Sequence, residues 1–510
     1  MASYPQIVIF LLLLATIIQA KNASFSLNLT ERGIDNIKTH VLPAAISKIL
    51  ALPLPDITQK VWPFTITISK LTVKELDLNA SDIAIDLLNN KISISVQHVA
   101  VKVEGDLVMS ALVSHEGTLS VDLSEITVSL SITISLNDAN KFQVDLSDIN
   151  VNIGNFQLSM SGSFFIEFIN LFIGLFKGLI QGQVQTQIQQ ALQTQVPTLI
   201  NQLLATIPED IKLPIPPVVP LSLHIEPISA PNIQDYSIEI NFYGYIYDYF
   251  MNKTEPPIPD PIAFVPSPTE KQIQITISQY IINSVFYALI DADVLSYVLI
   301  NIPGTNYTVT TDYIDYFLPG LVDQYGSNQM VIFLCSLPIA PEIDFLHPLY
   351  DITLEVNATC EIQPIHESRP IMVGKLTLNL NVSLDVLITN GSLSVNFTSA
   401  TCQNLDIIDT NFTTQHLDYL QDTINLGLAL GMKAIEPTIA IPGIEGISFN
   451  DTEILFGDGF IRIETNPDMS NWTMPNVDTF EKFYDGFTWV NFLDEDMFRT
   501  FLNNNTSYAY

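Results

Sequence analysis

Residues 161–208 read SGSFFIEFINLFIGLFKGLIQGQVQTQIQQALQTQVPTLINQLLATIP, and the rest of the chain is interpreted from this stretch. Positions 164–180 are apolar on nearly every side of a helix, and only Glu167 and Lys177 are ionisable. Such a helix must be surrounded by protein or by lipid. A bilayer span needs about 20 uninterrupted apolar residues. We therefore predict a long helix buried under a sheet, with a membrane span as the alternative.

The second part of this stretch is amphipathic and rich in glutamine. Pro197 can bend a helix here, and Pro208 can end it. The apolar positions recur every four residues, at Val184, Ile188, Leu192 and Val196. This spacing predicts that the helix continues beyond the apolar part with one buried face.

The composition excludes several classes of protein. The 510 residues are 47% hydrophobic and only 15% charged, which is typical of an ordered chain with two or more domains. The formal net charge of −34 argues against nucleic acid as a partner, because phosphates require clustered Lys and Arg. It also argues against electrostatic docking on anionic lipid.

The first residues predict export from the cytosol. Residues 1–20 have the apolar run and the small residue Ala20 of a signal peptide, without the usual basic start, so an uncleaved anchor is the alternative. No second segment is long enough to span a bilayer, and we expect a mature chain that is secreted or lumenal. Fourteen Asn-x-Ser/Thr sequons support export as glycosylation candidates: Asn22, Asn28, Asn79, Asn252, Asn306, Asn357, Asn381, Asn390, Asn396, Asn411, Asn450, Asn471, Asn504 and Asn505.

The chain has three cysteines, Cys335, Cys360 and Cys402, all in its second half. One disulfide with one free thiol is the expected state, and three unpaired thiols are the alternative. Spacing alone does not identify the pair.

The region up to about residue 153 predicts one helix followed by long strands. Thr30 is the expected N-cap of the helix, and prolines 53 and 55 close it. The strands alternate strictly, but the alternation slips by one residue at Gln97–His98 and again at Ser124–Glu125. A slip flips the buried face unless a bulge absorbs it. We therefore expect a strongly twisted antiparallel sheet with bulges at both places.

The second half repeats this order after a proline-rich connector. The segment ITISQYIINSVFYALIDADVLSYVL, residues 275–299, has the character of a helix. Alternating strands follow, then a second long helix at about 414–435 and a second proline-rich exit. Helix, sheet, long helix and proline-rich exit therefore occur twice, which predicts an internal duplication.

The chain resembles the bactericidal permeability-increasing, lipopolysaccharide-binding and cholesteryl-ester-transfer protein family, within the tubular lipid-binding superfamily. The resemblance spans roughly residues 25–465. It rests on LTERGIDNIKTHVLPAAISKIL with LPLPDI, on LHIEPISAPNIQDYSIEINFYGYIYD, and on EPPIPDPIAFVPSPTEKQIQITISQYIINSVFYAL. It implies an α+β boomerang of two tandem pseudo-symmetric lipid-binding barrels, each a highly twisted antiparallel sheet wrapped around a long helix, joined by a central sheet.

The sequence patterns and the resemblance together predict the domain limits. A signal peptide at 1–20 precedes a first barrel at 21–250, which contributes strands 219–250 to the central sheet. A proline-rich linker at 251–268, a second barrel at 269–465 and an acidic aromatic tail at 466–510 follow. We expect the tail to pack across the body, with a partner-binding or lipid-surface segment as the alternative.

Two features depart from the family pattern. The first half has no cysteine, whereas the family usually has a disulfide there. The stretch that matches the family's basic tip offers only Lys48 and Lys60. These departures weaken the expectation that the chain grips lipopolysaccharide phosphates.

Enzyme signatures are absent from the sequence, so we predict no enzyme, no cofactor and no metal site. There is no HExxH, no Gly-x-Ser-x-Gly, no phosphate-cradling glycine loop and no CxxC pair. His366–Glu367 does not form an acid–base pair on one face. The acidic run 494–496 lacks the spaced oxygen ligands of a calcium loop.

The remaining chemistry is apolar, and the expected function is binding or transfer of phospholipid or another acyl lipid. The alternatives are recognition of bacterial envelope lipid such as lipopolysaccharide, and a non-lipid adhesion or structural glycoprotein. The predicted lining consists of bulky residues on the helices of each half: Ile34, Ile37, Val41, Phe164, Phe165, Phe168, Phe172, Phe176, Tyr280, Ile281, Val285, Phe286 and Leu289. For each of these residues, plain core packing is the competing interpretation.

Overall fold

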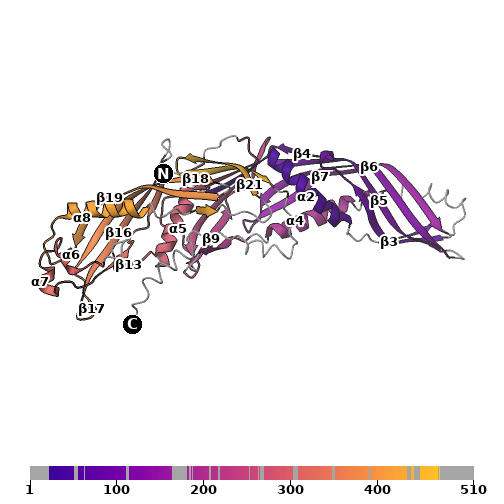
Figure 1. Cartoon of the computed structure of the whole chain (residues 1–510). Helices are drawn as coiled ribbons and strands as arrows, with labels where there is room; N and C mark the ends of the chain where they lie inside the picture. The colour runs from indigo at the N-terminus through magenta and orange to yellow at the C-terminus, as the bar shows by residue number, and fades with distance from the viewer. Residues whose placement is uncertain are drawn as a thin grey trace, which may run out of the picture.

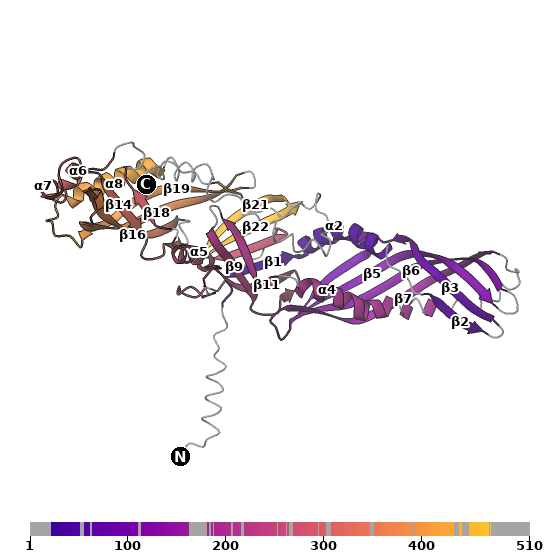
Figure 2. The same cartoon turned by 90° about the horizontal axis from the view of Figure 1, so that it is seen from below.

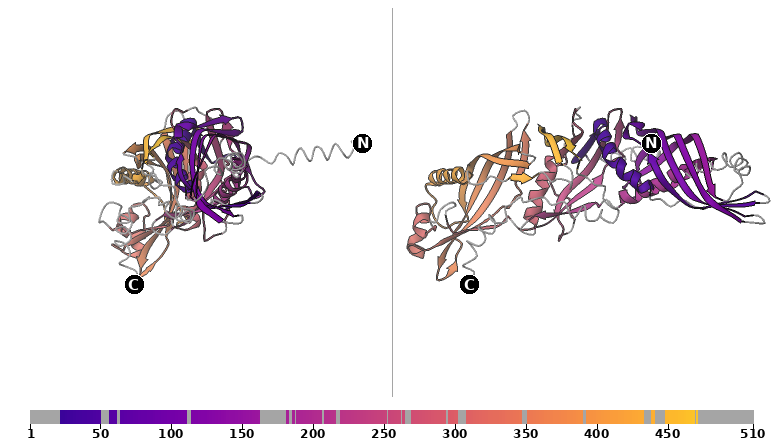
Figure 3. Two further views of the ribbon diagram at one scale, coloured as in Figure 1. Left: turned by 90° about the vertical axis from the view of Figure 1, so that its right-hand side faces the viewer. Right: turned by 45° about the vertical axis from the view of Figure 1, so that its right-hand side comes forward.

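A computed structural model gives the fold of most of the chain. It describes residues 22–50, 56–61, 64–110, 114–162, 181–182, 185–186, 188–205, 208–215, 219–251, 253–261, 263–264, 269–293, 295–301, 308–346, 351–389, 392–432, 438–440, 448–468 and 470. These residues form three antiparallel sheets that lie in a row along an elongated molecule (Figure 1). The right panel of Figure 3 shows the same row from another side. This is the α+β, twisted-sheet architecture that the sequence predicts.

The N-terminal sheet has the strand order β2-β3-β5-β6-β7, and β4 pairs with β5. Its strands are unusually long, because the alternating runs of the first half continue without interruption. They are β2 (Ile57–Val61), β3 (Phe64–Asp77), β4 (Ile83–Leu88), β5 (Lys91–Ser110), β6 (Ser114–Leu136) and β7 (Phe142–Gly162).

The C-terminal sheet has the order β13-β14-β16-β18-β19-β20, and the short strands β15 and β17 pair with β16. The strands are β13 (Tyr297–Leu299), β14 (Val331–Ser336), β15 (Glu342–Leu346), β16 (Asp351–His366), β17 (Arg369–Pro370), β18 (Gly374–Thr389), β19 (Ser392–Ile408) and β20 (Thr438–Ala440). Each half of the chain therefore builds one large sheet of its own.

The central sheet takes strands from both halves, in the order β21-β22-β12-β1-β11-β9-β8, with β10 beside β11. The strands are β1 (Phe25–Thr30), β8 (Asp210–Ile215), β9 (Val219–Pro227), β10 (Asn232–Gln234), β11 (Ser237–Asp248), β12 (Ile273–Ser278), β21 (Ser448–Gly457) and β22 (Phe460–Asp468). The first strands of the two halves, β1 and β12, pair with each other at its middle. The last strands, β11 and β22, flank that pair.

Helices lie along the two outer sheets. Figure 2 shows α2 and α4 running along the N-terminal sheet, and Figure 1 shows α8 beside β19. The helical elements are α2 (Glu31–Leu50), the 3-10 turn η1 (Ala80–Asp82), the π-helical turn η2 (Ala191–Gln195), α4 (Val196–Ala205), α5 (Gln279–Asp291), α6 (Thr311–Asp315), α7 (Leu321–Tyr325) and α8 (Leu417–Met432). The second predicted long helix therefore exists as α8; it begins three residues later than expected, and its predicted end lies outside the described residues. The predicted apolar helix at 164–180 lies outside the described residues.

The predicted bulges are found where the alternation slips. The register of β5 and β6 shifts between Val96 and Val99, and His98 has a φ of 56°. The same pairing shifts again between Val99 and Val101, where β6 has the extra residue, and Glu125 has a φ of 53°. One extra residue in a left-handed conformation restores the original face to the core. The same apolar side of the sheet is therefore buried along its whole length.

The predicted helix at 275–299 is wrong at both ends. Its first four residues belong to strand β12, and Tyr297–Leu299 form strand β13. The alternation of Ile273, Ile275 and Ile277 has a period of two, which fits the pleat of a strand. The Ser278 hydroxyl then accepts a hydrogen bond from the Tyr280 amide and caps α5. A strand thus leads directly into a helix, as β1 leads into α2 in the first half.

Candidate functional site

Buried apolar clusters fill the inner faces of both outer sheets. In the N-terminal sheet, Leu107, Leu119 and Ile126 belong to one cluster that spans β3, β5, β6 and β7. In the C-terminal sheet, Phe317 and Leu321 pack with strand residues and with partly buried residues of α8. The strands therefore present a continuous apolar surface at each end of the molecule.

Side-chain amides join a helix to the free edge of the N-terminal sheet. Among the described residues, strand β7 pairs only with β6. On its other side, Gln181 donates to the Ile153 carbonyl at 2.9 Å and Gln185 donates to the Val151 carbonyl at 2.6 Å. Further along, Asn201 of α4 accepts from the Val144 N–H at 2.7 Å and donates to the Val144 carbonyl at 3.0 Å. These four hydrogen bonds are called the N-terminal seam below.

The C-terminal sheet has an equivalent contact, the C-terminal seam, between α8 and β19. Asn425 accepts from the Cys402 N–H at 2.6 Å, and Gln421 donates to the Cys402 carbonyl at 2.8 Å. Gln421 also approaches the Gln403 carbonyl at 3.3 Å. In both halves, amide groups take the place of a neighbouring strand, because an edge strand carries N–H and C=O groups that need partners.

Sequence reasoning missed these amides. It treated the glutamine-rich run only as the polar side of an amphipathic helix. The signal was the i, i+4 spacing of Gln181 with Gln185 and of Gln421 with Asn425, which places two amides on one helix face. The same spacing occurs on the long helix that follows the outer sheet in each half.

The predicted lining residues fall into separate groups. Ile34 of α2 packs against Leu87, Ile233 and Ile238 at the junction of the N-terminal and central sheets, and Ile37 is half-buried. The α5 residues Ile281, Val285 and Leu289 pack on Leu221 and Ile246 of the central sheet, and Phe286 is half-buried. The side chains outside the described part are Val41, Phe164, Phe165, Phe168, Phe172 and Phe176.

Tyr280 belongs to a different cluster from the other predicted lining residues of α5. Its hydroxyl lies 2.6 Å from the hydroxyl of Tyr243, which also hydrogen-bonds Glu255 of the linker. Burial is the main cause that raises the pKa of Tyr280 to about 12. Both rings belong to a tyrosine cluster that packs against linker residue Ile258. Tyr280 thus contributes to the domain junction.

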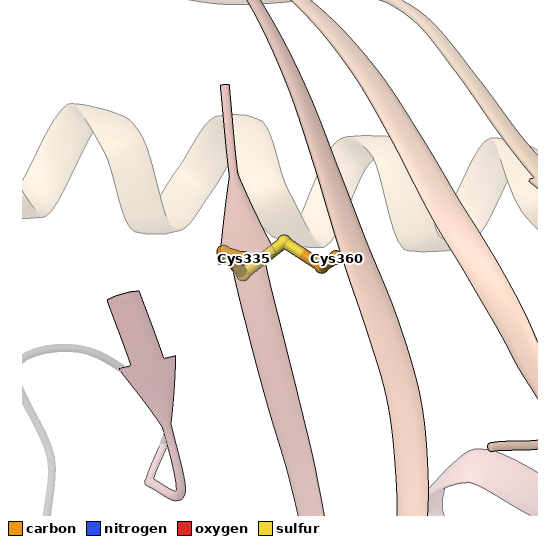
Figure 4. The surroundings of a disulfide bond; sticks show 2 residues. All are labelled: Cys335 and Cys360. Carbon is orange, nitrogen blue, oxygen red and sulfur yellow. A yellow bond between two sulfur atoms is a disulfide. The ribbon is translucent and has the colours of Figure 1, made fainter. Parts of the chain in front are cut away.

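The cysteines adopt one of the pairings that the sequence left open. A disulfide joins Cys335 of β14 to Cys360 of β16 (Figure 4). Cys402 is a buried free cysteine. The bonded residues are directly opposite each other in the two strands. Burial raises the pKa of the Cys402 thiol.

The described sequon residues differ in environment. Asn22, Asn79, Asn381 and Asn411 are exposed. Asn357 accepts a hydrogen bond from Asn379 at 2.9 Å. Asn28 lies on β1 between β11 and β12, and its side-chain oxygen is buried. The backbones of Asn396 and Asn450 lie in β19 and β21, and the other sequon asparagines lie outside the described part, as do residues 1–21 and 471–510.

One face of the central sheet is polar and buried. Ser26, Thr276 and Arg462 align across three neighbouring strands and are all at least 94% buried. The linker crosses this face. Lys253 contacts Asp210 at 3.1 Å at one end, and Thr269 hydrogen-bonds Glu464 at 2.5 Å at the other. The segment between β11 and β12 is therefore anchored at each end to a strand of the central sheet.

Asp210 and Asp451 make this junction sensitive to acid. Burial acts to raise the pKa of Asp210, but Lys253 and His224 outweigh it and leave the pKa below its usual value. The hydrogen bond from Lys271 lowers the pKa of Asp451. A carboxyl group with a depressed folded-state pKa stabilises the fold above its ordinary pKa and loses that contribution as the pH falls.

We therefore expect the unfolding midpoint to decline as the pH falls below about 4. Asp210→Asn should make this decline shallower, and Asp138→Asn, on an exposed turn, should leave it as in the unchanged protein. Denaturant unfolding from pH 7 to pH 2 measures both slopes. An identical acid slope for Asp210→Asn would contradict this account.

A comparison with protein-family descriptions gives one match. Residues 218–469 match "LBP / BPI / CETP family, C-terminal domain". They belong to the LBP / BPI / CETP family. This match covers the linker, the C-terminal sheet and most of the central sheet, so the family resemblance noted from sequence motifs is confirmed there. A comparison with curated proteins finds no match.

One solved structure extends the fold likeness to the first half. The fold is similar to that in a crystal structure of lipopolysaccharide binding protein, which is 17% identical, with a TM-score of 0.51, over 88% of this chain and 100% of that one. Takeout 1 of Epiphyas postvittana is 16% identical over 33% of this chain and 91% of that one, with a TM-score of 0.23. P47 of Clostridium botulinum E1 is 12% identical over 88% and 99%, with a TM-score of 0.28.

The described residues lack two features, a metal-binding cluster and a membrane-spanning helix. They contain no cluster of three or more His, Cys, Asp or Glu side chains that could hold a metal ion. Within them, no helix is both long enough and apolar enough to cross a membrane.

A polar pocket of about 340 Å³ lies between the linker, α5 and the C-terminal sheet, with Asp260, Glu342, Asp344 and Glu355 in its wall. Its polar wall sets it apart from the apolar faces of the outer sheets.

Proposed function

We propose that the chain is a secreted or lumenal lipid-binding or lipid-transfer protein without catalytic activity. The ligand is a phospholipid or another acyl lipid, held on the apolar faces of two barrels, residues 21–250 and 269–465, on either side of the linker 251–268. The observation that carries this proposal is the family match at residues 218–469. The helix-covered apolar sheet at each end of the molecule supports it.

Apolar contact alone can hold such a ligand. Burial of a methylene group contributes about 0.8 kcal/mol, so a 16-carbon chain contributes on the order of 12 kcal/mol before the entropy cost of binding. No charged clamp is needed. This agrees with the net charge of −34, which disfavours a site for an anionic headgroup.

The experiment is lipid analysis of the full-length chain purified from the medium or the secretory compartment of eukaryotic cells. We expect organic extraction and mass spectrometry to find co-purifying phospholipid, and a delipidated sample to bind a fluorescent acyl phosphatidylcholine. The same sample after heat unfolding serves as the control. Repeated absence of lipid together with no probe binding would refute the proposal.

Recognition of bacterial envelope lipid is the second candidate, supported by the fold likeness to lipopolysaccharide binding protein. The net negative charge of the chain would repel the phosphate groups of such a lipid. A pull-down with immobilised lipopolysaccharide at low salt, where electrostatic attraction is strongest, separates the two candidates. We expect no retention there, and strong retention would favour the second candidate.

A further inference from the structure

We propose that the N-terminal seam is the entrance through which an acyl chain reaches the apolar face of the first half. The proposal rests on the proposed function and adds the route and the residues that control it. Gln181 and Gln185 act as a latch in it, and the turn η2 acts as a hinge.

The seam is a weak line in the closure of the N-terminal sheet. The other side of β7 is joined to β6 by a backbone ladder that runs from Phe142 to Gly162. On the seam side, the hydrogen bonds between the described helical residues and β7 come from the three amide side chains of Gln181, Gln185 and Asn201. A side-chain amide exchanges a carbonyl partner for water at little net cost, whereas removing a strand breaks a whole ladder. Opening is therefore easiest along this line.

The three amides do not hold with equal strength. Asn201 uses both its oxygen and its nitrogen on Val144, so its contact is bidentate. Gln181 and Gln185 each make one bond, to carbonyl groups nine and seven residues further along β7. We expect Gln181 and Gln185 to leave the strand first, with Asn201 as the fixed point.

A break in the helix lies between the latch and the fixed point. Residues Ala191–Gln195 form a π-helical turn, and Pro197 is the second residue after it. Proline has no N–H to donate, and a π-helical turn widens the hydrogen-bond ring, so this turn has an irregular backbone. Irregular turns of this kind are where helices bend. Rotation here can release Gln181 and Gln185 while α4 stays in place.

The second half provides an internal comparison. The C-terminal seam uses Gln421 and Asn425 on a helix that is α-helical from Leu417 to Met432. Both amides bind within two adjacent strand residues, Cys402 and Gln403. The described part of this seam has no π-helical turn between its contacts. We therefore place the entrance at the N-terminal seam.

The test is the rate of lipid exchange in a latch variant of the full-length chain. Gln181→Met with Gln185→Met keeps side-chain length and helix propensity but removes both donors. We expect uptake of fluorescent acyl phosphatidylcholine from phosphatidylcholine vesicles, and its release, to be about tenfold faster. The matched control is Gln190→Met, an exposed glutamine on the same helical segment. It should change both rates less than twofold.

The outcomes separate this inference from the proposed function. If the unchanged protein binds no acyl probe, the proposed function fails and the entrance fails with it. If it binds the probe, and the folded latch variant exchanges lipid at the unchanged rate, only the entrance is refuted.

A second measurement needs no variant. Hydrogen exchange of the unchanged protein should be faster in residues 181–190 than in α4, and lipid loading should slow it. Equal protection of the two segments would also refute the entrance.

Discussion

Phe317→Ala should destabilise the C-terminal half by about 4 kcal/mol, which is the usual cost of removing a fully buried phenylalanine. The side chain is 1% exposed and belongs to the cluster that joins α6, α7 and the C-terminal sheet. Its ring makes edge contacts with Tyr313 and Tyr316 at centroid distances of 5.6 and 5.2 Å. The neighbouring rings and strands cannot close the resulting cavity without moving backbone.

The measurement is denaturant unfolding followed by a probe in the C-terminal half. Phe250→Ala is the matched control, because Phe250 is 73% exposed and its loss should change stability by less than about 0.5 kcal/mol. Equal midpoints for the two variants would show that Phe317 does not lie in a packed core.

Removing the Cys335–Cys360 disulfide should cost about 3 kcal/mol. The bond closes a loop with a sequence separation of 25, and a cross-link of this length restricts the unfolded chain by about that amount. It also joins two strands of the same apolar cluster that contains Phe317. We therefore expect the double variant Cys335→Ala with Cys360→Ala to lower the unfolding midpoint of the C-terminal half.

Reductant provides the internal check on this prediction. Dithiothreitol should bring the unchanged protein to the midpoint of the double variant and should leave that variant unaffected. Cys402→Ser removes the free thiol and no cross-link, so it should cost about 1 kcal/mol or less. An unchanged midpoint in dithiothreitol would contradict a stabilising disulfide.

Local sequence patterns predicted the local structure well. The slips at Gln97–His98 and Ser124–Glu125 located two bulges, because alternation reports directly which face of a strand is buried. Thr30 was predicted as an N-cap, and its hydroxyl accepts from the Gly33 amide at 3.4 Å as α2 begins. The error at 275–299 arose because a strand and the helix that it enters are both rich in isoleucine. Apolar content alone does not separate them.

Long-range contacts were less accessible from the sequence. The pairing of β1 with β12 joins residues about 250 positions apart, and only the family resemblance pointed to a central sheet. The amide contacts of Gln185 and Asn425 depend on which strand edge remains open, and no local pattern reports that. The predicted lining residues were chosen by helix periodicity, which identifies a buried face without naming its neighbour.

The shared central sheet has a consequence for any attempt to divide the protein. Strand β1 of the first half is hydrogen-bonded between β11 of its own half and β12 of the other. A cut within the linker would therefore leave both fragments associated through a backbone ladder. A chimaera that exchanges one half for that of a homologue must reproduce the β1–β12 register. The two halves consequently cannot be exchanged independently of each other, although each carries its own outer sheet.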